Sequence, residues 1–351
     1  PTLLASSMLV FMRVFADFGT PMLIGEGYKT LPVLIYNQFM GEVSGDDGFA
    51  AAICCIVIGL TIVMFFVQRF LAGRNTYAMT ALKPMAAESL GGLRNILAHL
   101  AVYMVVGLAI LPQFVVVYTS FLATNGGQVF AGGFALQSYD ATLFAKDNDV
   151  IWHTYFLGLC AIAAVLVLGV LIAYLSVRKR NTLNSILDVI TMFPFIIPGS
   201  VLGIAFVFAF NKSPIILTGT ALIMIISFAV RRMPYTVRSS SAILGNISPS
   251  IEEAAISLGA SDMTTFRKIT VPMMMPGVLS GAIMSWVTII SELSSIILYT
   301  NSTQTLTVSI YTEVIRGNYG NASAYATILT VTSILSLLLF YKVTGRRDVS
   351  V

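Results

Sequence analysis

The feature that most constrains the fold of this 351-residue chain is a series of long apolar runs separated by polar segments. A helix needs about 20 mostly apolar residues to cross the bilayer core. Eight stretches meet this requirement: residues 3–24, 49–69, 97–121, 153–177, 186–210, 215–232, 277–299 and 322–343. We therefore expect an all-α, polytopic membrane protein with about eight transmembrane helices embedded in a lipid bilayer.

The distribution of basic residues predicts how these spans are oriented. Charged residues make up only 10% of the chain, against roughly 25% in average soluble proteins. If the loop 231–275 is cytoplasmic, about 15 of the 20 basic residues fall on the cytoplasmic side, as the positive-inside rule requires. The pI near 9.0 is then a consequence of topology, and nucleic acid is not expected as a partner. The outer loops 25–48, 122–152 and 300–321 form the natural surface for an extracytoplasmic partner.

An internal repeat predicts the division of the chain. A shift of 275 residues aligns Asp17 with Glu292 and Pro1 with Pro276, in one register without gaps. We interpret residues 1–70 as the C-terminal part of a first half with two spans. Residues 71–95 are then a cytoplasmic linker, and residues 96–351 a complete second half with six spans. On this interpretation the front of the first half is missing, whether through truncation, fragmentation or its presence on a separate chain.

A polar segment at residues 248–276 interrupts the apolar pattern and predicts two helices joined by an elbow. Ser250 and Glu253 have the spacing of a capping box, which satisfies the free N–H groups at a helix start. Gly259 can end this helix in the left-handed conformation. Ser261 can then cap a second short helix that runs to about Ile269 and is ended by Pro272.

The full string E-A-A-x3-G-A-x5-F-x2-I-x2-P-x3-P-G resembles the EAA loop of ABC importer permeases. In that family the elbow is a coupling helix that sits in a groove of the ATP-binding subunit. The alternative is that the glutamate is only a cap partner and the glycine only a stop signal. The resemblance assigns ATPase docking to Glu253, Ala254, Ala255, Gly259, Ala260, Phe266, Pro272 and Pro276.

The resemblance also implies partners. No G-x4-G-K-[ST] phosphate-binding loop occurs in the sequence, so the chain cannot bind ATP by that route. We expect a transport subunit without enzymatic activity, working with two copies of an ATP-binding subunit that carry the ATP. A periplasmic substrate-binding protein and a location in the bacterial inner membrane are implied as well. The three cysteines show no metal-ligand spacing, and no cofactor or metal is expected on this chain.

Ionisable residues inside spans are costly and are candidates for function. Arg13 and Asp17 lie four residues apart and could simply neutralise each other. Asp188 could cap its helix or have a function. Asp17 and Glu292 occupy equivalent positions in the repeat, and we expect them to line a pathway between the halves and to assist a cationic substrate or a gate.

The run P-F-I-I-P-G breaks one span near its middle through Pro194, Pro198 and Gly199. Broken helices at that depth are tolerated where they line a cavity. We therefore hold two interpretations of this run equally, a part of the translocation pathway or a kink needed only for packing.

The fused layout, this run and the stretch from Glu292 to Tyr311 resemble ferric-iron ABC permeases. The resemblance implies ferric iron delivered by a periplasmic binding protein. Permeases for thiamine, 2-aminoethylphosphonate and hexose phosphate share the layout and remain alternatives. A secondary transporter and an ion channel are further alternatives. A secondary transporter has no use for an EAA loop, and an ion channel would need a pore-lining motif, which is not evident in the sequence.

Overall fold

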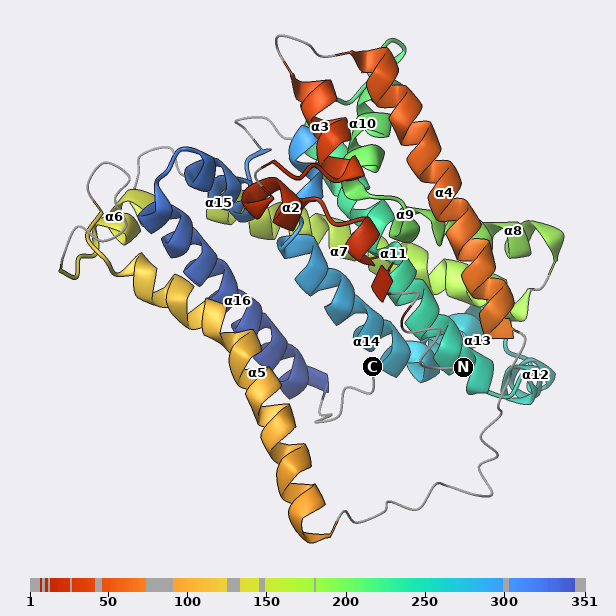
Figure 1. Ribbon diagram of the computed structural model, residues 1–351. Helices are drawn as coiled ribbons and strands as arrows, with labels where there is room; N and C mark the ends of the chain where they lie inside the picture. Colours follow the sequence, from red (N-terminus) through yellow and green to blue (C-terminus); the bar gives the residue numbers. More distant parts are fainter. Residues whose placement is uncertain are drawn as a thin grey trace.

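The computed structural model describes residues 7, 10–11, 13–25, 27–41, 46–73, 91–124, 133–144, 149–179, 181–298 and 303–344. These residues form a bundle of helices in which α7, α11 and α14 pack against one another, and α5 runs beside α16 (Figure 1). Most of the predicted linker 71–95 lies outside the described residues.

The elements follow one another as α2 (Gly19–Ile24), α3 (Leu31–Met40), α4 (Asp47–Gly73), α5 (Gly92–Ser120), α6 (Gln137–Leu143), α7 (Val150–Arg178), α8 (Thr182–Ile190), α9 (Phe193–Ile196), α10 (Gly199–Phe210), β1 (Asn211–Lys212), β2 (Ile215–Ile216), α11 (Ala221–Asn246), α12 (Ser250–Ser257), α13 (Asp262–Thr265), the π-helical turn η1 (Phe266–Thr270), α14 (Val271–Ile290), the 3-10 turn η2 (Ser294–Leu298), α15 (Leu306–Ile315) and α16 (Tyr319–Thr344). The strands β1 and β2 form a small antiparallel hairpin.

Most of the predicted spans correspond to helices that are long enough to cross a bilayer. Among the described residues, five helices are long and apolar enough to cross a bilayer: Gly48–Val67, Gly92–Ser120, Val150–Arg178, Asp262–Ile290 and Tyr319–Lys342. A sixth span results if Thr182–Ile196 and Gly199–Phe210, which meet at 112°, are taken as one broken helix. The all-α, polytopic class is therefore confirmed, with six of the eight predicted spans recognisable.

The other two predicted spans differ from the expectation. In the predicted span 3–24, helix ends at Phe15 and resumes at Gly19 after a break. The predicted span 215–232 begins in the β-hairpin, and its helix α11 continues to Asn246. The hydropathy pattern ends this span at the Arg231–Arg232 pair, although the helix continues, because hydropathy does not show that these charges have partners elsewhere in the fold. Residues 231–246, expected in a loop, are helical.

Small residues allow the central helices to approach closely. A Cβ atom on Gly277 of α14 would lie 2.6 Å from the Ser239 carbonyl oxygen, and one on Gly281 would lie 2.5 Å from the Thr236 Cα. A Cβ on Gly169 of α7 would lie 2.9 Å from Cγ2 of the same Thr236. Without a hydrophobic driving force between helices in lipid, such close contact is a main source of helix association.

The secondary structure repeats with the offset seen in the sequence. Adding 275 to the bounds of α3 gives those of α15, and the break at residues 16–18 corresponds to the break at 291–293. The two breaks lie side by side, because a Cβ on Gly19 would be 3.2 Å from Leu293 Cδ2. Pro1 lies outside the described residues, and the division into two halves stays a prediction.

Candidate functional site

The segment 248–276 forms an elbow at one end of the bundle, where α12 and α13 lie (Figure 1). The helix α12 ends at Leu258, and Gly259 follows with a φ of +91°, a conformation that costs glycine little. Ser261 then caps α13, since its hydroxyl accepts a 3.3 Å hydrogen bond from the Thr264 N–H. The predicted helix, elbow and second helix are confirmed.

Two details of the predicted elbow are wrong. Ser250 is the first residue of α12 and not its cap; its hydroxyl lies 2.8 Å from that of Ser248, and the Glu253 N–H donates to the Pro249 carbonyl. Pro272 does not end the second helix, which runs on as α14. The π-helical turn η1 precedes this proline, and the wider turn accommodates a residue that has no N–H to donate.

Two contacts fix the elbow to α7. The Arg178 Nε lies 2.9 Å from Glu252 Oε1, and its Nη2 donates a 2.8 Å hydrogen bond to the Ile247 carbonyl. The two side chains of this ion pair are only 9% and 13% exposed. The Phe266 ring packs edge-on against Tyr174, with ring centroids 4.8 Å apart. Sequence reasoning missed Glu252, because its partner lies 74 residues away and Arg178 was counted only as a topological charge.

The outer side of the elbow is exposed and largely apolar. Glu253 and Ala254 are exposed, and Ala255 and Ala260 are half-buried. The Leu258 side chain beside Gly259 is 91% exposed. Other exposed apolar residues on the elbow are Ile251, Ile256 and Met263. We call these residues together the elbow surface.

A second cluster lies where two broken helices meet. Glu292 follows the end of α14 and is only 4% exposed. Its Oε1 lies 2.5 Å from Arg231 Nη1, and its Oε2 accepts a hydrogen bond from Arg232. The same Oε1 accepts a 2.9 Å hydrogen bond from the Ser294 N–H. We call Arg231, Arg232 and Glu292 the Glu292 clamp.

The clamp touches the break between α9 and α10. A Cβ on Gly199 would lie 2.1 Å from Arg231 Nη1 and 2.2 Å from Ser294 Cβ, so only glycine fits there. The Thr307 hydroxyl donates a 2.8 Å hydrogen bond to the Glu292 carbonyl and adds α15 to the junction. The predicted break at Pro194, Pro198 and Gly199 is thus present in the structure. Its place in a pathway stays a prediction.

The remaining candidate residues have other partners than expected. Arg13 donates a hydrogen bond to the Tyr235 hydroxyl, and its guanidinium lies 5.5 Å from the Phe195 ring centroid. The ion pairs found among the described residues do not join Arg13 to Asp17, which is half-buried, so their mutual neutralisation is not supported.

Asp188 does not cap α8, because Asn181 does so. Its carboxylate lies 3.3 Å from Arg238 Nη2 of α11 instead, and both side chains of this ion pair are partly exposed.

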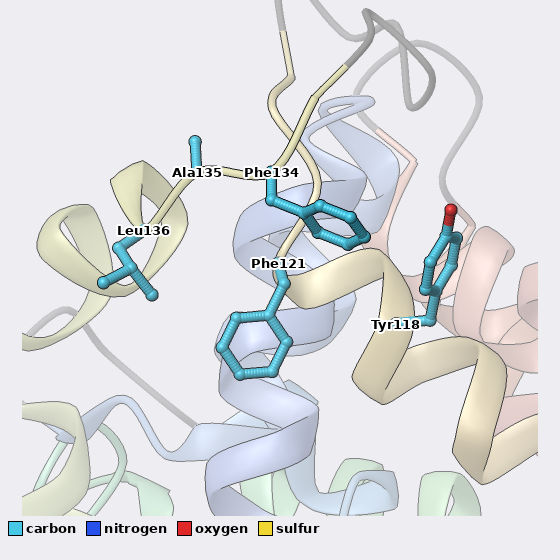
Figure 2. Close-up of a pocket in the computed structure, with 5 residues that line it drawn as sticks. All are labelled: Tyr118, Phe121, Phe134, Ala135 and Leu136. Carbon is cyan, nitrogen blue, oxygen red and sulfur yellow. The ribbon is translucent and has the colours of Figure 1, made fainter.

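An apolar hollow of about 510 Å³ lies at the end of α5, lined by Tyr118, Phe121, Phe134, Ala135 and Leu136 (Figure 2). Its aromatic lining is typical of a membrane–water interface. Within the described part of the chain, no group of three or more His, Cys, Asp or Glu side chains is placed to hold a metal ion.

Among the described residues, five apolar spans, or six if the broken helix is counted as one, define a polytopic membrane protein. The chain belongs to the family of binding-protein-dependent transport system inner membrane components, whose model matches residues 165–347. The matched region includes the broken helix, the clamp and the elbow.

Curated relatives support this membership. The ferric transport system permease protein FbpB of Actinobacillus pleuropneumoniae is 31% identical over 98% of this chain and 51% of that protein. The putative ferric transport system permease protein FbpB 1 of Haemophilus influenzae is 30% identical over 85% of this chain and 47% of that protein. The chain therefore spans about half the length of these relatives. The putative 2-aminoethylphosphonate transport system permease protein PhnV of Salmonella typhimurium is 27% identical over 67% of this chain and 89% of that protein.

Solved structures share the fold. A crystal structure of a bacterial ABC transporter involved in the import of the acidic polysaccharide alginate has a chain that superposes with a TM-score of 0.57 at 14% sequence identity. The match covers 72% of this chain and 96% of that chain.

Proposed function

We propose that this chain is a permease subunit of an ATP-driven importer that moves ferric iron across the bacterial inner membrane. The observation that carries this proposal is the 31% identity to a ferric transport permease over 98% of the chain. A periplasmic binding protein would deliver the iron. The related alginate transporter, crystallised in complex with its oligosaccharide-bound periplasmic protein, supports a partner of this kind.

The elbow surface is the proposed docking site for a separate ATP-binding subunit on the cytoplasmic side. Its exposed leucine and half-buried alanines offer a close apolar contact, and Glu253 offers an exposed carboxylate for a basic group. The Arg178–Glu252 ion pair and the Phe266–Tyr174 contact hold this surface to α7. The complete importer would carry two copies of the ATP-binding subunit, one for each permease half.

A second candidate substrate is 2-aminoethylphosphonate, which the name of a relative at 27% identity supports. That match covers 67% of this chain, whereas the ferric match covers 98%. Ferric iron is therefore the better supported substrate.

The test is ATP-dependent uptake into proteoliposomes that contain the complete transporter and the binding protein encoded beside it. We expect uptake of radioactive ferric iron, with no uptake of radiolabelled 2-aminoethylphosphonate. Uptake of the phosphonate in place of iron would overturn the substrate, and uptake that needs no ATP would overturn the importer class.

A further inference from the structure

We propose that the Glu292 clamp is a latch that holds two broken helices together across the translocation pathway and opens in each transport cycle. Glu292 acts in it as a positioning residue. This inference rests on the proposed transport function but not on the identity of the substrate.

The latch lies near the middle of the long helix α11. Arg232 is 11 residues from the start of α11 and 14 from its end, or roughly 17 and 21 Å along the axis. The side chains of Glu292, Arg231 and Arg232 are only 2%, 11% and 17% exposed. Buried charges of this kind are retained where they pair with one another, and removal of one partner is strongly unfavourable. The carboxylate of Glu292 accepts hydrogen bonds from one Nη of each guanidinium group and from the first N–H of η2 at once, whereas the Nε atoms of both arginines are buried without a partner among the described residues.

The clamp holds η2 against α10. A Cβ on Gly203 would lie 3.6 Å from Ile297 Cβ, and the Gly199 backbone is in contact with Arg231 and Ser294. Movement of η2 away from α11 would require Glu292 to leave the two arginines, and it would separate η2 from Gly199 and Gly203 of α10. Non-helical backbone at membrane depth is tolerated where it is buried in protein or lines a cavity, and this junction would become cavity wall on opening.

A continuous helix connects the elbow to the latch. The helical segment Asp262–Ile290 starts at the elbow and ends two residues before Glu292. Its 29 residues correspond to roughly 43 Å of helix. A displacement at the elbow is thus transmitted along one helix to the Glu292 carboxylate, while the two arginines belong to α11. A conformational change in a docked ATP-binding subunit would therefore reach the clamp directly through this helix.

The first experiment removes the charge of the latch in the complete reconstituted transporter. Glu292→Gln keeps the shape of the side chain, and we expect uptake per ATP hydrolysed to fall at least tenfold while hydrolysis persists. Asp188→Asn is the matched control, because it removes a carboxylate that pairs with Arg238 of the same helix at an exposed site. We expect this control to change the ratio less than twofold. An unchanged ratio in the Glu292→Gln transporter, present at normal amounts, would overturn the latch.

The second experiment locks the junction and does not require that Glu292 be replaced. Gly203→Cys with Ile297→Cys is made in a chain whose Cys54, Cys55 and Cys160 are replaced by alanine. The Cβ separation suits a disulfide, whose Cβ atoms lie about 3.8 Å apart. We expect oxidation to reduce uptake at least tenfold and reduction to restore it.

Full uptake by the cross-linked protein, or failure of the cysteines to form the disulfide, would overturn the proposal. Uptake by the unmodified transporter is measured in parallel with iron and with 2-aminoethylphosphonate. A wrong substrate is thereby distinguished from a wrong latch.

Discussion

The Arg178–Glu252 ion pair makes a quantitative prediction about the elbow. Glu252→Gln keeps the size of the side chain and an acceptor oxygen but removes the negative charge that faces the Arg178 guanidinium, which then has only neutral oxygens as partners. Breaking a buried ion pair costs about 3–5 kcal/mol, and an exposed pair contributes about 0–1 kcal/mol. The pair is 9% and 13% exposed and borders a hollow of about 220 Å³ at the elbow. We therefore expect a loss of about 2 kcal/mol, between these limits.

Hydrogen exchange of the amides in α12 measures this loss, because the helix can open locally without unfolding the spans. A change of about 2 kcal/mol corresponds to exchange that is roughly 30-fold faster. The neighbouring Glu253→Gln removes an exposed carboxylate from the same helix and should change exchange less than twofold. The double substitution Arg178→Glu with Glu252→Arg should restore part of the protection. Equal exchange in the Glu252→Gln and Glu253→Gln proteins would show that the ion pair does not hold the elbow.

Three further predictions concern helix packing and backbone conformation. Gly277→Val should abolish folding, seen as loss of the protein from the membrane fraction, because its Cβ would lie 2.6 Å from the Ser239 carbonyl oxygen; a normal amount of protein would refute the close helix contact. Phe266→Ala removes the ring contact with Tyr174 and should destabilise the elbow by about 1 kcal/mol, measured by exchange in α12 and α13. Gly259→Ala, at a φ of +91°, should cost about 1–2 kcal/mol; unchanged exchange would argue against this turn.

Local features of the elbow were predictable from the sequence because their causes are local. The left-handed turn at Gly259 and the cap at Ser261 depend on residues within a few positions. The end of the second helix at Pro272 was predicted wrongly, because the π-helical turn η1 before this proline lets the helix continue into α14. The sequence pattern carried no indication of the π-helical turn η1.

The junction could be predicted only in part. The repeat singled out Glu292, and the P-F-I-I-P-G run located the break at Gly199. The arginines that hold Glu292 lie 60 and 61 residues away in the sequence. The positive-inside rule explains these arginines as topology signals, because a rule that counts charges cannot distinguish a paired, buried arginine from a solvated one. Only the tertiary fold shows that these groups form one cluster.

The π-helical turn η1 has a consequence for how the elbow and the span can vary. A turn of this kind holds one residue more than an α-helical turn, which corresponds to roughly 100° of helix rotation. The direction in which Phe266 faces Tyr174 is therefore set independently of the direction in which Gly277 faces α11. A chain one residue shorter between residues 267 and 269 could keep both contacts, with an ordinary α-helical turn in place of η1. The same deletion between Gly277 and Gly281 would rotate Gly281 and Glu292 together, relative to the contact of Gly277 with α11.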